Sequence, residues 1–441
     1  MNEVNITELV AHLVLQLAVI LFAAKLGGEL FERWLKQPSV LGELLAGVVV
    51  GPYALGGMQL PLVGALFGHT AESAAVSVIP VSSELWAVGQ IGAVILLFYA
   101  GLETDFGLFF RYSGPAFFVA MGGVILPFIL GDLATVAFGV ASGPMDPVAL
   151  FMGAVMTATS VGITARVLGD IRKLDTPEGV TILAGAVIDD VLGIIVLAIV
   201  VSLGVSGDVS LGNIALVGGK AMGFWLGLMA VGILLSKWIS RFLASFRSAG
   251  AALTLALAIA FLASGLAEIF GLAMIIGAYS IGLALSNTEI AETLREPMES
   301  VYHAFVPAFF VVMGMLLDFS AMGPVLVFGL AVSVLAILGK LLGCGIPALA
   351  VGFNRLGATR IGIGMMPRGE VALIVAGVGL SREVIQSDVF GVAIMMTFIT
   401  TVLAPLLLVP AFRTGGQGTR RATTRVHPVQ VEMETTERKG A

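Results

Sequence analysis

The apolar run at 178–204, EGVTILAGAVIDDVLGIIVLAIVVSLG, contains two adjacent acids, Asp189 and Asp190. The run is longer than the roughly 20 apolar residues with which an α-helix crosses a bilayer. At about 1.5 Å per residue, the acids lie about 18 Å from the start of such a helix, near the middle of the membrane. Because a charged side chain at that depth costs a few kcal/mol on insertion scales, we interpret the run as a membrane helix whose acids carry a function.

The rest of the chain has the same apolar character. Of its 441 residues, 58% are hydrophobic and 12% are charged, whereas a soluble globular chain carries about 25% charged residues. The single cysteine, Cys344, excludes an intramolecular disulfide, and the four histidines lack ligand spacing, so we expect neither a metal centre nor a cofactor. No P-loop is present, which argues against a nucleotide partner and an ATP-driven pump, and no feature indicates a nucleic acid partner.

Apolar stretches of roughly 18 or more residues predict an all-α polytopic membrane protein. Thirteen transmembrane helices are predicted, at 8–25, 38–56, 84–102, 114–140, 148–168, 178–204, 211–236, 250–267, 271–287, 298–317, 322–352, 357–380 and 387–411. Lysines and arginines fall on alternate loops of this arrangement, and among the loop charges only Arg382 lies on the opposite side. Since cytoplasmic loops retain positive charge, we expect a multi-pass protein of the cell inner membrane with its N-terminus outside and its C-terminus cytoplasmic.

Two pairs of short motifs recur between the halves of the chain. GELLAGVVVG at 42–51 resembles GAYSIGLALS at 277–286, and GLETDF at 101–106 resembles GMLLDF at 314–319. In the predicted topology the members of each pair run in opposite directions, which predicts two inverted repeats, spans 1–6 and 8–13, linked by span 7. The alternative is a chance likeness between glycine-rich membrane helices, since small residues also serve helix packing.

A lysine is predicted to meet the acid pair. Lys340 lies at the same depth as Asp189, in a span that runs in the opposite direction, so a salt bridge between them is predicted. Adjacent helical residues point about 100° apart, so Asp190 needs a different environment, a wet cavity where its carboxylate binds Na⁺ or a proton. The alternatives are an Asp189 that bonds to nearby backbone and a Lys340 that snorkels to the interface. Two other deep charges, Asp132 and Lys220, are assigned no role.

Two predicted spans contain sequences that make poor continuous helix. The fifth holds TATSVG at 157–162, where Thr157, Thr159, Ser160 and Gly162 would support a helix break, and the twelfth holds PRGE at 367–370. Thr159 and Ser160 would also support the ion, together with the backbone of the break. Discontinuous helices at corresponding positions of two repeats indicate a transport site, because unwound backbone offers carbonyls and helix dipoles to the ion. Arg368 and Glu370 are expected to serve the broken helix rather than the ion. The alternative is a kinked packing helix.

Together these residues resemble the NapA-type bacterial Na⁺/H⁺ antiporters of the second monovalent cation:proton antiporter family. The likeness covers essentially all the predicted spans. It rests on GELLAGVVVGP at 42–52, TATSVGITARVLGD at 157–170, AVIDDVLGI at 186–194, GKLLGCGIPA at 339–348 and PRGEVALI at 367–374.

The resemblance implies an NhaA/NapA-like fold with crossed discontinuous helices 5 and 12, and a homodimer. Within a transporter unit at 1–412, it implies a dimerisation domain from about 1–106 and 250–320 and a core domain from about 113–204 and 322–412. The helix at about 211–236 would link them. The polar residues at 413–441 are expected to form a disordered cytoplasmic tail.

The resemblance also implies that Asp190 is the principal ion carrier in a Na⁺ and proton site that includes Asp189. It further implies that an Asp-Asp pair with a lysine marks electrogenic exchange. We therefore expect a secondary active transporter, not an enzyme, that exchanges Na⁺, or Li⁺, for H⁺ by elevator-like movement of the core domain. Lys340 would carry the second proton, released when the cation separates it from Asp189. K⁺/H⁺ exchange and a non-transporting cation sensor stay open as alternatives. An intramembrane aspartyl protease is disfavoured, because adjacent acids on one helix cannot form its dyad.

Overall fold

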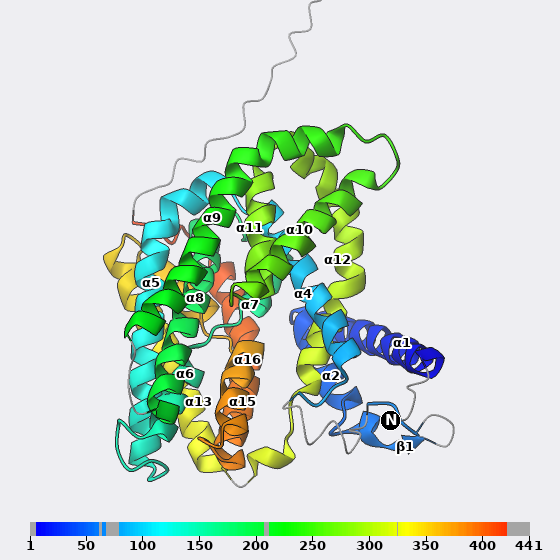
Figure 1. The fold of residues 1–441 in the computed structure, drawn as a ribbon. Coiled ribbons are helices and arrows are strands. Elements are labelled where there is room, and N and C mark those ends of the chain that lie inside the picture. Colours follow the sequence, from blue (N-terminus) through cyan, green and yellow to red (C-terminus); the bar gives the residue numbers. More distant parts are fainter. Residues whose placement is uncertain (1–5, 61–63, 68–78, 207–210, 324, 421–441) are drawn as a thin grey trace, which may run out of the picture.

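The computed structural model describes residues 6–60, 64–67, 79–206, 211–323 and 325–420. Within them the chain is helical except for loops, one isolated bridge and a short antiparallel hairpin of β1 (Gln59–Leu60) and β2 (Gly64–Ala65). The predicted all-α polytopic class is confirmed (Figure 1).

The helices follow the predicted apolar stretches closely. In chain order they are α1 (Ile6–Leu30), the π-helical η1 (Phe31–Leu35), α2 (Ser39–Val50), the 3₁₀-helical η2 (Leu55–Gly57), α4 (Ser83–Glu103), α5 (Phe106–Ala137), α6 (Pro147–Thr157), α7 (Val161–Asp170), α8 (Pro177–Ser206), α9 (Leu211–Ala244), α10 (Ala251–Ile269), α11 (Met274–Ser286), α12 (Glu289–Met315), the 3₁₀-helical η3 (Ser320–Met322), α13 (Leu326–Ala350), α14 (Arg355–Gly364), α15 (Glu370–Ser381) and α16 (Ser387–Arg413).

Among the described residues, eleven segments are long and apolar enough to cross a membrane. One of them, Pro147–Asp170, contains α6 and α7 together. The predicted ninth span falls on α11, and the apolar part of the predicted twelfth falls on α15; both helices are shorter than the other spans. The chain is therefore a multi-pass membrane protein.

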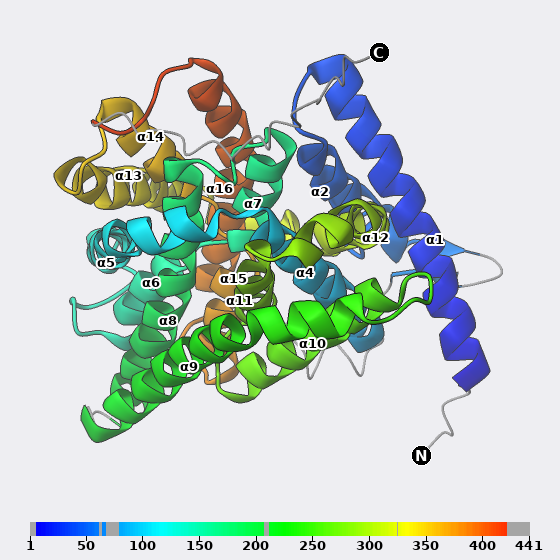
Figure 2. The ribbon, with the colours of Figure 1, turned by 90° about the horizontal axis from the view of Figure 1, so that it is seen from above.

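The helices pack into two bundles on either side of α7. The first bundle contains α1, α2, α4, α10, α11 and α12, and the second contains α5, α6, α8, α13, α14, α15 and α16. Figures 1 and 2 show these groups on opposite sides of the molecule, and α9 packs on both α8 and the α10–α11 pair. The intervening α7 contacts α2 and α4 of the first bundle and α8 and α16 of the second.

Glycines allow the first bundle to pack closely. A Cβ at Gly47 on α2 would overlap the backbone of α12, and a Cβ at Gly282 on α11 would overlap the backbone of α4. The partner glycines, Gly314 on α12 and Gly101 on α4, are equally crowded by α2 and α11. The glycines of the recurring motifs therefore lie at two reciprocal contacts, α2 with α12 and α11 with α4.

The chain just after α16 differs from the predicted disordered tail at 413–441. Residues 414–420 lie against α14 and the turn before it. The backbone N–H of Asn354 donates to the Gly418 carbonyl at 2.8 Å, and Phe353 forms an isolated bridge with Thr419. The Arg360 guanidinium donates to the carbonyls of Gly415 and Gly416, so this segment is held in place up to Arg420. Residues 421–441 lie outside the described residues.

Candidate functional site

The centre of the site is an ion pair between α8 and α13. Lys340 Nζ donates to Asp189 Oδ1 at 2.9 Å, and both side chains are almost completely buried, at 0% and 1% exposure. The predicted contact between these residues, 151 positions apart, is therefore present. Since a buried charge is strongly destabilising unless paired, each residue accounts for the burial of the other.

Asp190, the next residue on α8, lies outside this pair. Its side chain is buried, and Oδ2 has no hydrogen-bond partner among the described residues. The charges that act on it belong to Asp189, Glu370 and Lys340. A buried carboxylate oxygen without a donor is costly, and a proton or a cation would satisfy it. Asp190 thus fits an exchangeable occupant, whereas Asp189 has a fixed protein partner.

Both predicted helix breaks are present. The first separates α6 from α7 at 158–160, where Ala158 (φ −53°, ψ 143°) and Ser160 (φ −87°, ψ 105°) are non-helical. The second separates α14 from α15 at 365–369. The breaks meet directly, because the Ser160 N–H donates to the Pro367 carbonyl at 2.8 Å and the Thr164 hydroxyl donates to the Gly364 carbonyl at 2.6 Å.

Charged side chains occupy the ends of the half-helices. The fully buried guanidinium of Arg368 donates to the Met156 carbonyl, in the last turn of α6, at 2.8 Å and to the Met366 carbonyl at 3.0 Å. Glu370 is the first residue of α15. A cation at a helix C-terminus and an acid at a helix N-terminus both interact favourably with the partial charge of the helix dipole at that end. Gly369 keeps the breaks close, since a Cβ there would lie 2.7 Å from Ser160 Oγ.

The hydroxyls of the first break are not equivalent. Thr157 Oγ1 donates to the Ala154 carbonyl of its own helix at 2.8 Å, and Thr159 Oγ1 is 3.5 Å from the Met365 carbonyl. Ser160 Oγ is buried and has no partner within the described chain. Gly162 packs against α12, where a Cβ would lie 3.1 Å from the Phe309 ring. Of these four predicted residues, Ser160 therefore has the side-chain oxygen best able to serve an ion.

Two further threonines, which the sequence analysis missed, hold the second break. The hydroxyl of Thr401 on α16 donates to the Arg368 carbonyl, and the Arg368 N–H donates to Thr400 Oγ1 at 3.2 Å. The adjacent hydroxyls in an otherwise apolar span were the available signal. The unassigned Asp132 is buried on α5 with Oδ1 unpartnered in the described chain, and Lys220 is exposed on α9.

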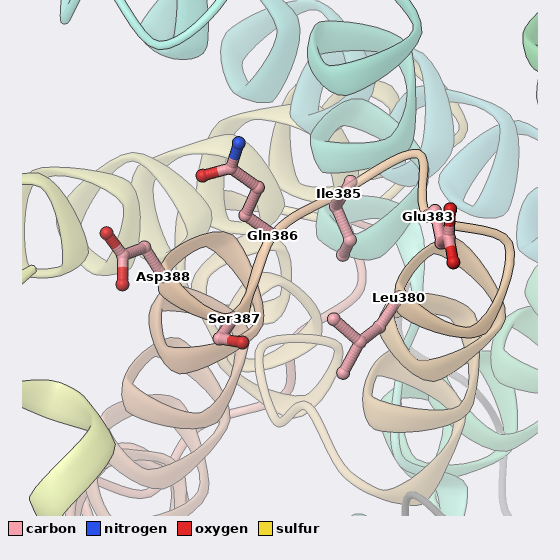
Figure 3. Close-up of a pocket in the computed structure, with 6 residues that line it drawn as sticks. All are labelled: Leu380, Glu383, Ile385, Gln386, Ser387 and Asp388. Carbon is pink, nitrogen blue, oxygen red and sulfur yellow. The ribbon is translucent and has the colours of Figure 1, made fainter.

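Two hollows in the described part of the molecule lie away from Asp189 and Asp190. Figure 3 shows one around the turn between α15 and α16, lined by Leu380, Glu383, Ile385, Gln386, Ser387 and Asp388. A neighbouring hollow of about 650 Å³ also reaches the C-terminal end of α5, α6 and α13, through Phe138, Val148 and Phe328. Neither is lined by Asp189 or Asp190.

A multi-pass helical bundle in which two broken helices meet near buried ionisable groups defines a secondary transporter. The chain belongs to the sodium/hydrogen exchanger family, because residues 18–414 match the family described as "Sodium/hydrogen exchanger, transmembrane". The resemblance to Na⁺/H⁺ antiporters drawn from the motifs is confirmed.

Individual relatives match over nearly the full chain. The high-affinity Na⁺/H⁺ antiporter NhaS3 of Synechocystis sp. is 37% identical, over 97% of this chain and 95% of its own. The Na⁺/H⁺-K⁺ antiporter GerN of Bacillus cereus is 36% identical, over 89% of this chain and 94% of its own. The solved structure of the sodium proton antiporter MjNhaP1 from Methanocaldococcus jannaschii matches with a TM-score of 0.66 at 19% identity, over 92% of this chain and 99% of that one, which shows a shared fold.

Proposed function

We propose that this protein exchanges Na⁺ for H⁺, with Asp190 as the carrier of both. The observation that carries the proposal is the buried Oδ2 of Asp190, which has no partner among the described residues, beside an Asp189 already paired with Lys340. Because one carboxylate cannot hold Na⁺ and a proton together, competition for Asp190 couples the two fluxes. The names of NhaS3 and GerN support antiport as the reaction class.

The packing supports an elevator-like mechanism. Under this proposal the first bundle forms the dimerisation domain of a homodimer, α9 is the linker, and the second bundle with α7 is the mobile core that carries Asp190 across. The reciprocal contacts of α2 with α12 and of α11 with α4 are those expected of two inverted repeats. Under this proposal α11 and the α14–α15 pair also span the membrane, which would make thirteen helices with the eleven long spans. The fifth span (α6–α7) and the twelfth (α14–α15) would then cross at their breaks.

The orientation rests on the charge distribution. With Arg172 and Lys173 following α7 and Arg247 following α9, we place these loops in the cytoplasm of a cell whose inner membrane holds the protein. The C-terminus would then be cytoplasmic and the N-terminus outside.

The decisive experiment uses purified protein in proteoliposomes containing a pH-sensitive dye. Addition of Na⁺ or Li⁺ should dissipate an imposed pH gradient in the wild type and not in Asp190→Ala. Wild-type-like flux in that variant would reject Asp190 as the carrier. Cation binding without flux in the wild type would instead indicate a cation sensor.

Potassium exchange is the second candidate. It is favoured by GerN, whose name includes K⁺ and which is 36% identical to this chain. The same assay with K⁺ separates the candidates, because a K⁺ exchanger would respond to K⁺ at concentrations similar to those of Na⁺.

A further inference from the structure

A second buried charge network joins the two bundles on the side of the membrane where α7 ends. Arg166 on α7 is 3% exposed, and its Nη2 lies 3.3 Å from Glu43 Oε1 and 3.1 Å from Ser39 Oγ, both on α2. Its guanidinium carbon lies 5.0 Å from the ring centroid of Tyr302 on α12. Its Nε lies 3.3 Å from Asp170 Oδ2 on its own helix. A single side chain therefore connects α7 to two helices of the first bundle.

This network cannot survive a sliding motion unchanged. Glu43 is 2% exposed, so the pair is withdrawn from solvent. Removing one partner of such a pair leaves an uncompensated buried charge, which is strongly unfavourable. In the proposed elevator, Arg166 moves with the second bundle while Glu43, Ser39 and Tyr302 stay with the first. Movement must then break all three contacts together.

The part of α7 between Arg166 and the first helix break is also closely packed against the first bundle. Arg166 lies six positions after Ser160, about 9 Å along a helix. Ile163, one turn nearer the break on the same face as Arg166, is buried. At Gly162 a Cβ would lie 3.1 Å from Phe309 of α12 and 3.6 Å from Leu96 of α4. This side of the break is therefore closed by contact between α7 and the first bundle.

We propose that the ion pair between Arg166 and Glu43 is a gate that holds the transporter closed on the side of the membrane where α7 ends. Arg166 is then a positioning residue for exchange: it does not touch the ion but sets how often the core moves to open that side. The proposal rests on the proposed elevator-like exchange and adds a residue pair that controls it.

The chain contains a matched control pair. Glu178 on α8 and Arg360 on α14 form an ion pair at 2.7 Å that is as deeply buried as the gate. Both residues belong to the second bundle, so sliding leaves this pair intact. Loss of the Glu178 charge should perturb packing without releasing the core, whereas loss of the Glu43 charge should release it.

The test is cysteine labelling in a Cys344→Ala background, which removes the only native cysteine. Ile163→Cys is the reporter, and a membrane-impermeant maleimide is applied to right-side-out and inside-out vesicles. Glu43→Gln should raise the labelling rate from the side where α7 ends by roughly tenfold or more. Loss of one partner of a buried ion pair destabilises the closed state by more free energy than a tenfold increase in the open population requires. Glu178→Gln should leave the rate within about twofold of the parent, since its pair moves as one body.

An unchanged labelling rate in a folded Glu43→Gln protein, or an equal increase in Glu178→Gln, would overturn the gate. Should Glu43→Gln fail to fold, Arg166→Lys is the second variant. It keeps the charge but cannot contact both Glu43 and Ser39 of α2, so its labelling rate should lie between that of the parent and the tenfold increase. Labelling needs no ion gradient, so it is independent of the flux assay. If Glu43→Gln alters labelling but the protein shows no Na⁺/H⁺ flux, the proposed function is rejected and the gate is retained. If the protein shows flux but Glu43→Gln does not alter labelling, the gate is rejected and the proposed function is retained.

Discussion

The guanidinium of Arg368 donates to the carbonyl of Met156 at 2.8 Å, across 212 positions of sequence, and so joins the end of α6 to the break between α14 and α15. The Met156 carbonyl belongs to the last turn of a helix, where carbonyls lack intrahelical donors. One arginine thus satisfies an acceptor at one break from its position in the other. The two breaks therefore depend on each other for stability.

Arg368→Gln should lower the thermal stability of the purified protein. It removes charge-assisted hydrogen bonds worth about 1.5–3 kcal/mol each, from a side chain that has no solvent to replace them. Thermal unfolding in detergent, followed by tryptophan fluorescence, measures the effect. Arg382→Gln, at an exposed loop arginine, is the control and should unfold like the wild type. Equal midpoints for the two variants would contradict the role of Arg368 as a cap.

Asp190→Asn should abolish exchange while the protein stays folded, because the amide cannot be an anionic ligand or take up the proton. The matched control is Asp132→Asn, which neutralises another buried acid on α5, one whose Oδ1 has no partner in the described part of the chain. Exchange should persist in this control. The measurement is Na⁺-driven proton flux, with size-exclusion profiles to verify folding. Loss of flux in both variants would mean that buried acids in general, and not Asp190 in particular, support transport.

Lys340→Gln should give slower, nearly electroneutral exchange. If Lys340 is the second proton carrier, two protons cross per Na⁺ in the wild type, and the membrane potential contributes about 2.3 kcal/mol per 100 mV. A K⁺ diffusion potential imposed on proteoliposomes should then drive Na⁺ accumulation in the wild type only. An equal response in the variant would leave Lys340 with a structural role alone.

The same substitution should also destabilise the protein, because Asp189 loses its partner at 2.9 Å and remains buried. Breaking a buried pair in this way costs about 3–5 kcal/mol, whereas removal of both charges can be nearly neutral. The double variant Asp189→Asn with Lys340→Gln should therefore unfold at a higher temperature than Lys340→Gln alone. A lower midpoint would show that the pair is not the source of the loss.

Ser160→Ala should raise the apparent KM for Na⁺ more than it lowers the maximal rate. Its hydroxyl is buried and unpartnered in the described chain, whereas the Thr157 hydroxyl is already bonded to Ala154. Thr157→Val is the control and should keep its affinity, and Thr159→Ala should fall between the two. Unchanged affinity in the Ser160→Ala protein would leave only the backbone of the break as a ligand.

Asp146 gives a pH-dependent prediction outside the membrane spans. Hydrogen bonds from the backbone and hydroxyl of Ser142 and from the N–H of Val148 hold the pKa of this carboxyl below its usual range. A lowered folded-state pKa adds stability above the unfolded pKa, and this is lost as pH falls through the folded value. Asp146→Ala should thus lower the free energy of unfolding at neutral pH by about 1 kcal/mol, as for other N-caps. The difference from wild type should shrink below about pH 4. A difference independent of pH would rule out the charged cap.

The sequence by itself determined the features that depend on local composition. Apolar length specified the membrane helices, since a residue in lipid must be apolar whatever its neighbours are. The motifs at 157–162 and 367–370 specified both helix breaks, because proline, glycine and clustered hydroxyls weaken helix within a few residues. The equal depth of Asp189 and Lys340 in their predicted spans was enough to predict their ion pair, because neither charge is stable alone in an apolar interior.

Only the tertiary structure decided how residues distant in sequence are combined. Arg166 lies inside the motif at 157–170 as an ordinary basic residue near a helix end. Glu43 lies 123 positions before it, so nothing local indicated their ion pair. The same holds for the Arg368 bond to Met156 and for the ordering of residues 414–420 by Arg360. Such contacts depend on which helix faces pack together, and packing is decided by the whole set of close helix contacts rather than by any one segment.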